Sequence, residues 1–388
     1  MRKWTKYTPQ TLIVYIGDEK CLVIGMPKIS LCQLFGAYNY AGIAQVAVQL
    51  SLKLRGEFEV TPITREIERR VEEDIDIVEL KSRTTAEYWK ALNRIVNQFD
   101  IVHTHDVYSL PGLLRKKRTA KIVYTDHGIV PLKYSPIKSF HGIVFAHLCR
   151  LFSRRADVCV GISDYIVDEL KNRIGCLNVM KIPNGIDTEK FRPINESREY
   201  LKLKLGDPML LKVGLVEKHK AVDYHIASMP YILKKFPKAH LVFIGTGKEI
   251  DYYRTVVRTM RLGHSVHFLG WVPNHMLPLY YNAADIVLQA DYWHGFGLPL
   301  LEGMACGKPV IARDAYAMRE HILKSGAGVL VRGDDIQEIA MAVEHILDNY
   351  DFYALKAREY AKRFDWNCIA AQYKRAYERL FNLRIKNE

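Results

Sequence analysis

The sequence lacks the features that mark several large classes of protein. Its seven cysteines are scattered over 388 residues, are odd in number and form no CxxC pair, which argues against a disulfide framework and against a zinc site. The polar start MRKWTKYTPQ does not resemble a signal peptide, and no apolar run approaches the roughly 20 residues that span a bilayer. Low-complexity tracts and repeats of solenoid length are also missing. These absences predict a globular cytoplasmic protein that crosses no membrane.

Size and charge limit the number of domains and the kinds of binding partner that the chain can have. A chain of 388 residues is too long for one typical core and suits two α/β domains. Hydrophobic residues make up 49% and charged residues 26%, which excludes a disordered or fibrous chain. The net charge is +13, and residues 101–155 carry +8 of it. A local basic region suits docking on an anionic membrane or an anionic acceptor, although many such regions are only solvated surface. Nucleic-acid binding is not predicted, because no recognised module accompanies the charge.

Part of this basic region, IKSFHGIVFAHLCRLFSRR, predicts an amphipathic helix. One interpretation is a peripheral contact with the inner face of a membrane. The other is that the apolar stripe covers the sheet of the first domain, and the sequence leaves both open. The stripe consists of Ile137, Phe140, Val144, Leu148 and Leu151, with Lys138, Arg150, Arg154 and Arg155 at its ends.

Apolar, β-branched runs alternate with amphipathic stretches along the chain. The runs are KISLCQL, DIVHTH, KIVYTDH, DVCVGIS and VMKIPNG, and then MLLKVGL, HLVFIGTG, SVHFLGW, DIVLQAD, KPVIAR and GVLV. Between them, GIAQVAVQLSLKLR, YHIASMPYILKKF and IQEIAMAVEHIL have the spacing of helices. This alternation predicts an α/β protein with two Rossmann-like, doubly wound parallel-sheet domains facing across a cleft.

The polar segment FRPINESREYLKLKLGD separates the two sets of runs, so the domain boundary is expected within residues 193–207. We expect one domain over residues 1–195 and a second over residues 196–365. Within the first, TLIVYIGDEKCLVIG in residues 1–25 predicts an added hairpin.

The stretch YWHGFGLPLLEGMACGKPVIA has the marks of an anion site. It follows the predicted strand DIVLQAD, and ligands of such sheets bind beyond the carboxyl ends of the strands. Gly295 and Gly297 allow a close approach of the backbone, and Pro299 suits a helix start. The free N–H groups and the helix dipole would attract an anion. Glu302 is expected in the first turn, where it either stabilises the dipole or accepts hydrogen bonds from sugar hydroxyls.

The same stretch resembles the signature EGFGLPxLEAMACGxPVIA of the retaining glycosyltransferases of family 4, which have the GT-B fold. Other segments agree with that family in order and spacing. AGIAQVAVQLSLKL resembles its first glycine loop and helix, YTDHG its active-site histidine, and VGLVEKHKAVD its motif VGRLxxEKGxD. FDWNCIAAQYKRAYERL resembles its closing helix, which implies that residues 366–388 return to the first domain. The resemblance covers residues 27–383.

The resemblance implies a nucleotide-sugar donor held mainly by the second domain, with the first domain taking the acceptor. As catalytic residues it implies His127, which would hydrogen-bond the donor sugar, Lys220, which would neutralise the leaving diphosphate, and Glu302, which would hold the ribose. Amides of Gly297 and Leu298 would bind the diphosphate. The rest of the implied donor site is Gly42, Gly214, the backbone of Val272, His294, Gly295 and Phe296.

A metal or other cofactor is not expected. No DxD-type motif lies in a suitable loop, which fits a family whose lysine and helix dipole replace Mg²⁺. The implied reaction moves a sugar, with retention, to a hydroxyl of a lipid, glycan or small-molecule acceptor. The alternative is a catalytically silent GT-B module that binds nucleotide or partners another glycosyltransferase.

Three departures from the family pattern surround the implied donor site. His294 replaces the first Glu, Leu215 replaces the Arg that accompanies Lys220, and Tyr316-Ala317 stands where Gly-Gly is usual. A neutral imidazole hydrogen-bonds a hydroxyl, whereas a protonated one partly replaces a missing cation. His294 is therefore either a compensated contact, linked to the loss of the Arg at Leu215, or a sign of lost catalysis.

Overall fold

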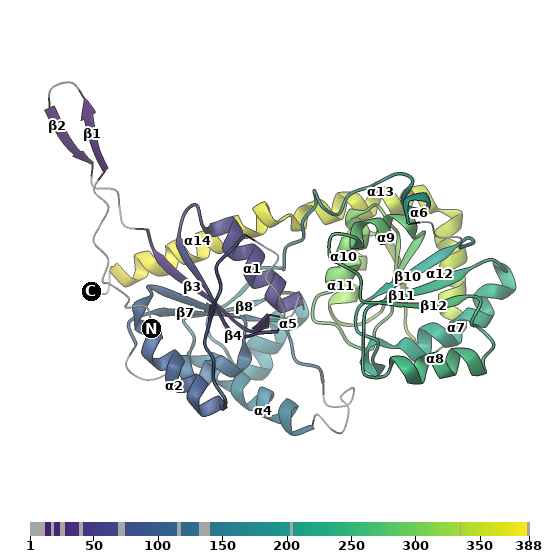
Figure 1. Ribbon diagram of the computed structural model, residues 1–388, viewed down its shortest axis with the longest axis horizontal. Helices are drawn as coiled ribbons and strands as arrows, with labels where there is room; N and C mark the ends of the chain where they lie inside the picture. The colour runs from purple at the N-terminus through teal and green to yellow at the C-terminus, as the bar shows by residue number, and fades with distance from the viewer. Residues whose placement is uncertain are drawn as a thin grey trace.

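The computed structural model describes residues 12–16, 19–23, 28–38, 42–68, 74–114, 118–131, 140–201, 205–333 and 335–385. These residues form two parallel sheets covered by helices, and a separate two-stranded sheet (Figure 1). The two-stranded sheet pairs β1 (Leu12–Ile16) with β2 (Glu19–Val23) in antiparallel register. No described helix combines the length and the apolarity needed to cross a membrane.

The first parallel sheet has seven strands in the order β5-β4-β3-β6-β7-β8-β9. The central strands β6, β7 and β8 are almost fully buried, as expected for parallel strands covered on both faces. The strand order reverses direction between β3 and β6. The strands are β3 (Ser30–Tyr38), β4 (Glu59–Ile67), β5 (Val78–Glu79), β6 (Ile101–Thr104), β7 (Lys121–Asp126), β8 (Val158–Gly161) and β9 (Val179–Lys181).

Local sequence signals set several helices around this sheet. The α2 helix begins after Thr84, whose side chain accepts a hydrogen bond from the backbone N–H of Glu87 at 3.2 Å. The α5 helix begins after Ser163 in the same way. The helices are α1 (Gly42–Leu54), α2 (Thr85–Ile95), α3 (Leu110–Leu113), α4 (Phe140–Arg150) and α5 (Asp164–Asp168), with short turns η1 (Val96–Gln98), η2 (Val107–Ser109), η5 (Leu151–Arg155) and η6 (Glu169–Ile174).

The second parallel sheet has six strands in the order β12-β11-β10-β13-β14-β15. Its order reverses direction between the neighbouring strands β10 and β13, and such a point is where ligands of open α/β sheets bind. The strands are β10 (Met209–Val213), β11 (His240–Ile244), β12 (Val266–Gly270), β13 (Ile286–Gln289), β14 (Val310–Arg313) and β15 (Gly328–Val331).

Helices cover the second sheet, and the last helix returns to the first. Trp366, Ile369, Tyr373 and Tyr377 of α14 are buried in one cluster with core residues of the first sheet, and Figure 1 shows α14 lying along that half. The helices are α6 (Ser197–Tyr200), α7 (Val222–Lys235), α8 (Ile250–Thr259), α9 (Leu277–Ala283), α10 (Leu298–Ala305), α11 (Tyr316–Ser325), α12 (Gln337–Asp348), α13 (Tyr350–Ala361) and α14 (Trp366–Ile385), with turns η7 (Lys218–Lys220) and η8 (Lys362–Phe364).

The predicted fold class is confirmed, and the eleven apolar runs form β3 and β6 to β15. The sequence analysis missed β4 and β5. The β4 segment EVTPITREI carries Pro62 and is buried only over its middle three residues, so its pattern is weak. Pairing with β3 over eight register positions compensates for that weakness. Tertiary contact, which sequence periodicity does not report, makes this segment a strand.

Candidate active site

The loops that carry the predicted donor residues meet between the two sheets. A Cβ placed on Gly295 would lie 2.3 Å from the carbonyl oxygen of His127, so only glycine fits this approach. The Ser163 hydroxyl donates to the carbonyl oxygen of Gly295 at 3.0 Å. A Cβ on Gly42 would lie 3.3 Å from Cδ1 of Leu298. Both halves of the chain therefore line one site at the carboxyl ends of their strands.

The N-terminus of α10 has the predicted anion-binding geometry. Gly297 caps this helix with φ of 102°, a left-handed conformation that favours glycine. Leu298 begins the helix and Pro299 follows it, so Gly297 and Leu298 carry amides at the positive end of the helix. That these amides bind an anion, as the resemblance implies, stays a prediction, and this helix end is suited to it.

Glu302 is the fifth residue of α10 and does not lie in its first turn. The expectation of a first-turn position is wrong, because the helix begins at Leu298 and not later. The carboxylate accepts a hydrogen bond from the hydroxyl of Tyr281 at 2.7 Å, and Tyr281 is fully buried. Burial raises the pKa of Glu302, and the bond from Tyr281 opposes that rise. The side chain is thus held in one orientation by a buried partner, and the helix dipole does not account for its place.

Lys220 lies beside a buried carboxylate that the sequence analysis did not single out. Its Nζ is 3.3 Å from Oδ2 of Asp291, and Nζ of Lys212 is 2.7 Å from Oδ1 of the same residue. Burial alone would raise the pKa of Asp291, but Lys212 and Lys220 hold it below its usual range. Lys212 stands inside the run MLLKVGL, and lysine is almost never fully buried without a partner. A lysine within an apolar strand is therefore the sequence signal that predicts a buried acidic partner.

His294 lies at the edge of the same cluster. Its Nε2 is 3.8 Å from Oδ2 of Asp291. Burial, together with the charge of Lys220, lowers the pKa of His294 well below its usual value, so the ring is neutral near pH 7. A protonated His294 does not replace a missing cation. Leu215 is 48% exposed, and the charged groups that act on His294 are Lys220, Asp291 and Lys212.

His127 follows β7 and begins a buried chain of hydrogen bonds. Its Nε2 lies 3.0 Å from Nδ1 of His105, and Nε2 of His105 lies 3.1 Å from Oε1 of Gln33. Burial lowers the pKa of His127 to about 4 and that of His105 well below its usual value. Both rings are therefore neutral near pH 7 and act as one donor and one acceptor each.

The chain continues through the core to α14. Nε2 of Gln33 donates to the hydroxyl of Tyr377 at 3.1 Å, and that hydroxyl lies 2.6 Å from Nδ1 of His103. Nε2 of His103 lies 2.7 Å from Oγ1 of Thr125, which lies 3.0 Å from the hydroxyl of Tyr373. Helix α14 thus contacts the His127 site through polar groups, although it follows the second sheet in sequence.

These contacts fix the proton positions on the rings. Because Gln33 donates through Nε2, its Oε1 accepts, and His105 must donate from Nε2 and accept at Nδ1. His127 then donates from Nε2 to His105, which leaves its own Nδ1 as an acceptor. A ligand hydroxyl is the kind of group that such an acceptor binds.

The remaining predicted donor residues differ in what they offer. Gly214 follows β10 with φ of 138°, and Val272 is half-buried after β12. Phe296 is 4% exposed and its ring packs edge-on against His321 and Phe364. Its side chain is therefore part of the core, and its role at the donor stays a prediction.

Two residues near the site have left-handed backbones without being glycine. Tyr316 has φ of 52° and Ala221, directly after Lys220, has φ of 50°. Tyr316 packs edge-on against Tyr165 of the other half, with ring centroids 4.9 Å apart. Tyr316, which stands where the family has glycine, thus adopts a conformation that favours glycine, at a cost in backbone strain.

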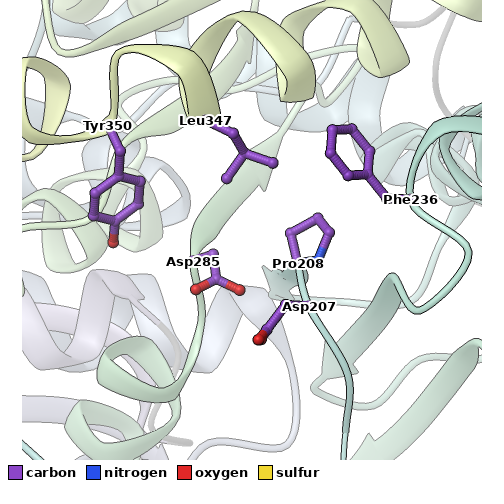
Figure 2. Close-up of a pocket in the computed structure, with 6 residues that line it drawn as sticks. All are labelled: Asp207, Pro208, Phe236, Asp285, Leu347 and Tyr350. Atoms are coloured by element: carbon purple, nitrogen blue, oxygen red, sulfur yellow. The ribbon is translucent and has the colours of Figure 1, made fainter.

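Two further observations concern metal binding and a hollow away from this site. Among those residues, no group of three or more His, Cys, Asp or Glu is arranged to hold a metal ion. A hollow of about 450 Å³ opens beside the amino ends of β10 and β13, the edge opposite the donor loop (Figure 2). Its lining consists of Asp207, Pro208, Phe236, Asp285, Leu347 and Tyr350.

Two family models match consecutive parts of the chain. The model described as Glycosyltransferase Family 4 matches residues 40–190, and the one described as Glycosyl transferases group 1 matches residues 193–364. A phosphatidyl-myo-inositol mannosyltransferase of Mycolicibacterium smegmatis is 29% identical over 295 residues, which cover 74% of this chain and 73% of that protein.

Solved structures have the same architecture. Sucrose-phosphate synthase from Thermosynechococcus elongatus has a TM-score of 0.79 at 22% identity, covering 91% of this chain and 100% of that one. Anabaena HepE in complex with UDP-glucose has a TM-score of 0.73 at 17% identity, covering 90% and 99%. The two matched segments contain every strand of the second parallel sheet and every strand of the first except β3. The chain belongs to the group 1 glycosyltransferases of the GT-B fold and is a glycosyltransferase.

Proposed function

We propose that the chain transfers a sugar from a nucleotide-sugar donor to a hydroxyl of an acceptor, with retention at the anomeric carbon. One observation carries the proposal: Lys220, the amino end of α10 and Glu302 lie on one side of the site, and His127 approaches from the other. The names of similar proteins support it, since HepE is seen with UDP-glucose and the mycobacterial relative is a mannosyltransferase.

The chain's own groups divide the work of this reaction. Lys220 and the amides of Gly297 and Leu298 stabilise the negative charge on the departing diphosphate. Glu302, oriented by Tyr281, accepts hydrogen bonds from the ribose hydroxyls. The bond between the anomeric carbon and the diphosphate oxygen breaks, the acceptor oxygen bonds to that carbon from the same face, and its proton passes to the diphosphate. No metal is required in this scheme, because lysine and helix dipole supply the positive charge.

The test is a screen with sugars linked to UDP, GDP and ADP. Thermal shift identifies the donor, release of the nucleoside diphosphate reports turnover, and proton NMR of the product reports the anomeric configuration. Lys220→Met should lower the rate of release by about 10²- to 10³-fold, while the exposed control Lys234→Met should not change it. An inverted product would contradict retention, and no release with any sugar nucleotide would favour the silent module.

We also propose that the half of the chain that forms the first parallel sheet docks peripherally on an anionic membrane surface that presents the acceptor. The basis is an exposed apolar face on α4 and η5, flanked by the exposed Arg154 and Arg155. Its apolar members are Phe145, Leu148, Leu151 and Phe152, which are 37%, 55%, 41% and 38% exposed. The inward side is formed by Ala146, Cys149 and Arg150.

The predicted stripe needs two adjustments. Leu148 and Leu151 are exposed, which opposes the interpretation that the stripe covers the sheet. Arg150 is buried and pairs with Asp126 and Glu169, so its assignment to a basic end of the stripe is wrong. The other cation at that end, Lys138, and the stripe member Ile137 lie outside the described residues, and the side chain of Phe140 is not described.

Sedimentation with anionic vesicles at low and high salt tests this docking. Binding should weaken as salt rises, and the double variant Leu148→Ser with Leu151→Ser should reduce it strongly. Leu355→Ser, at a 61% exposed position of α13, is the matched control. Absence of pelleting at low salt would remove the membrane proposal while leaving the transfer reaction untouched. The six cysteines whose side chains are described are all free, and a reducing compartment such as the cytoplasm is part of this proposal.

A further inference from the structure

Asp291 is the most deeply buried charged group of the donor half. Its side chain has no exposure, and the side chains of Lys212 and Lys220 are 3% and 12% exposed. Neither carboxylate oxygen has the geometry of a hydrogen bond, so the two lysines hold it by charge. Burying such ions is expensive, and apolar side chains of similar size would stabilise the fold at least as well. A cluster of this kind in a ligand site therefore points to function.

The cluster is built at the point where the second sheet changes direction. Lys212 lies in β10, and Asp291 follows β13, its neighbour in the sheet. Nζ of Lys212 also donates to Oε1 of Gln289 at 2.6 Å, which ties it in place. Of the three charged groups only Lys220 has appreciable exposure. Lys220 is the group that a ligand meets, and Lys212 and Asp291 stand behind it.

The balance of charge explains why two lysines are needed. With Asp291 ionised and His294 neutral, the cluster carries two positive charges and one negative charge. If Lys212 were absent, Asp291 would cancel the charge of Lys220 and repel an approaching diphosphate. With Lys212 present, Asp291 holds the ammonium of Lys220 in place while the cluster keeps a net charge of about +1.

We propose that Lys212 and Asp291 are positioning residues of the donor site: Asp291 orients Lys220 toward the donor diphosphate, and Lys212 neutralises Asp291 so that Lys220 stays attractive to that anion. This inference rests on the proposed function. It accounts for the loss of the usual cation at Leu215 and the usual carboxylate at His294, because both charges are present at other positions. The site is rearranged and is not decayed.

The same arrangement explains why position 294 holds an imidazole. A carboxylate there would lie about as close to Asp291 as the imidazole does, at 3.8 Å, and two carboxylates at that distance do not both ionise readily. His294→Glu alone should therefore lower the transfer rate at least tenfold, and adding Asp291→Asn should restore part of it by removing the repulsion between the two carboxylates. Adding Leu215→Arg to His294→Glu should restore less, because Leu215 is partly exposed and Asp291 is the nearer charge.

Calorimetric titration separates the charge effect from a merely structural one. The probes are UDP, GDP and ADP, each compared with its uncharged nucleoside. Lys212→Met keeps the length of the side chain and should weaken binding of the nucleoside diphosphate at least tenfold without changing binding of the nucleoside. The double variant Lys212→Met with Asp291→Asn removes the whole pair and retains the net charge, so it should recover part of the affinity, although Lys220 then lacks the carboxylate that orients it. Lys234→Met is the surface control.

Two results for the variants would overturn the inference, and one result for the unmodified chain would overturn the proposed function. Equal loss of nucleoside and nucleoside diphosphate binding in Lys212→Met would make the pair structural and overturn the inference. A double variant that binds as weakly as Lys212→Met would also overturn it, and the double variant folds without a buried charge left alone. If the unmodified chain binds none of the three nucleoside diphosphates, the proposed function itself fails, and this inference fails with it.

Discussion

The neutral wall of the site, formed by β3, β6 and β7, places a hydrogen-bonded chain of uncharged groups behind His127, whereas the charged wall, formed by β10 and β13, places buried ions behind Lys220. On the first wall His127, His105 and Gln33 pass hydrogen bonds inward to α14. On the second, Lys212 and Asp291 stand behind Lys220. Both walls lie at the carboxyl ends of parallel strands, so the fold does not dictate the difference.

The difference follows from what each wall must bind. A sugar offers hydroxyls, and a neutral ring with a fixed acceptor atom matches one of them without a charge to neutralise. A diphosphate offers negative charge, which requires cations held in place before the ligand arrives. Under the proposed function, the first wall meets the sugar and the second meets the diphosphate.

The largest expected effect comes from removing the exposed cation of the charged wall. Lys220→Met should lower the transfer rate by about 10²- to 10³-fold, the usual loss when one preorganised group that stabilises the leaving charge is removed. Steady-state assays with the donor found by the screen measure it. A change below threefold would show that the charged wall does not serve the departing group.

Glu302 tests whether the charged wall also holds the ribose. Glu302→Ala should weaken donor binding by about 1–3 kcal/mol, because hydroxyls are left unpaired. It also removes the acceptor of the buried Tyr281 hydroxyl, so it should lower stability. Glu302→Gln keeps that acceptor and should lose affinity with less loss of stability. Titration and urea unfolding of both variants separate the two roles, and unchanged affinity in both would make Glu302 structural.

A substitution at Tyr377 disrupts the hydrogen bonds of the neutral wall most directly, because its hydroxyl bridges Gln33 and His103. Tyr377→Phe should cost about 1–3 kcal/mol of unfolding free energy, because two buried polar groups lose a partner. Nitrogen-15 NMR of the unmodified chain should show His127 with its proton on Nε2, and the variant should show a mixture of tautomers. Tyr200→Phe, at a 69% exposed position, is the control. A proton on Nδ1 of His127 in the unmodified chain would contradict the assigned direction of the chain.

Acid should weaken the neutral wall in a defined window. Burial lowers the pKa of His103 to about 3 and that of His127 to about 4, while an unfolded histidine titrates near 6.5. The unfolded chain therefore takes up protons below about pH 6.5 that the folded chain refuses, so stability is full above that pH and falls toward pH 4. Each such histidine should cost about 1.5 kcal/mol between pH 6.5 and pH 5.

Urea midpoints at pH 7.5, 6.5 and 5 measure this loss. His103→Gln should be less stable overall but should show a smaller dependence on pH. The exposed His275→Gln should keep the original dependence. A midpoint that stays constant from pH 6.5 to pH 5 would contradict the neutral state of these rings.

The smallest expected effect concerns the backbone beside the charged wall. Ala221 has φ of 50° directly after Lys220, and this conformation costs a non-glycine residue about 1–2 kcal/mol. Replacing Ala221 by glycine relieves this strain, but part of the gain in stability is lost because glycine has a greater conformational entropy in the unfolded chain. Ala221→Gly should therefore stabilise the chain by about 0.5–1 kcal/mol in urea unfolding. Destabilisation by that variant would show that the conformation is not strained.

The parts of the molecule that follow from sequence are those with local causes. Buried parallel strands appear as continuous apolar runs, and the donor loop shows its glycines and Pro299 beside one another. The contacts that define the walls are not local. Gln33 bonds to Tyr377 across 344 positions, and Lys212 meets Asp291 only because β10 and β13 are neighbours in the sheet.

The sequence nonetheless shows charged residues within or beside apolar runs. Lys212 interrupts an apolar run, and Asp291 ends one, yet each alone is compatible with a surface position. The start of α10 at Leu298 also shifted Glu302 out of the first turn, because helix boundaries depend on the backbone conformation of Gly297. The sequence predicted a candidate site whose ligand chemistry stays a prediction, whereas the charges behind Lys220 became visible only in the structure.

The most direct test of the two-wall account is a crystal structure with the nucleotide sugar identified by the screen. The account predicts that the diphosphate contacts Lys220 and the amides of Gly297 and Leu298, with the ion pair between Lys212 and Asp291 intact behind it. A hydroxyl of the sugar should donate to Nδ1 of His127. A diphosphate bound away from Lys220, or a sugar that does not reach the His127 wall, would contradict the account.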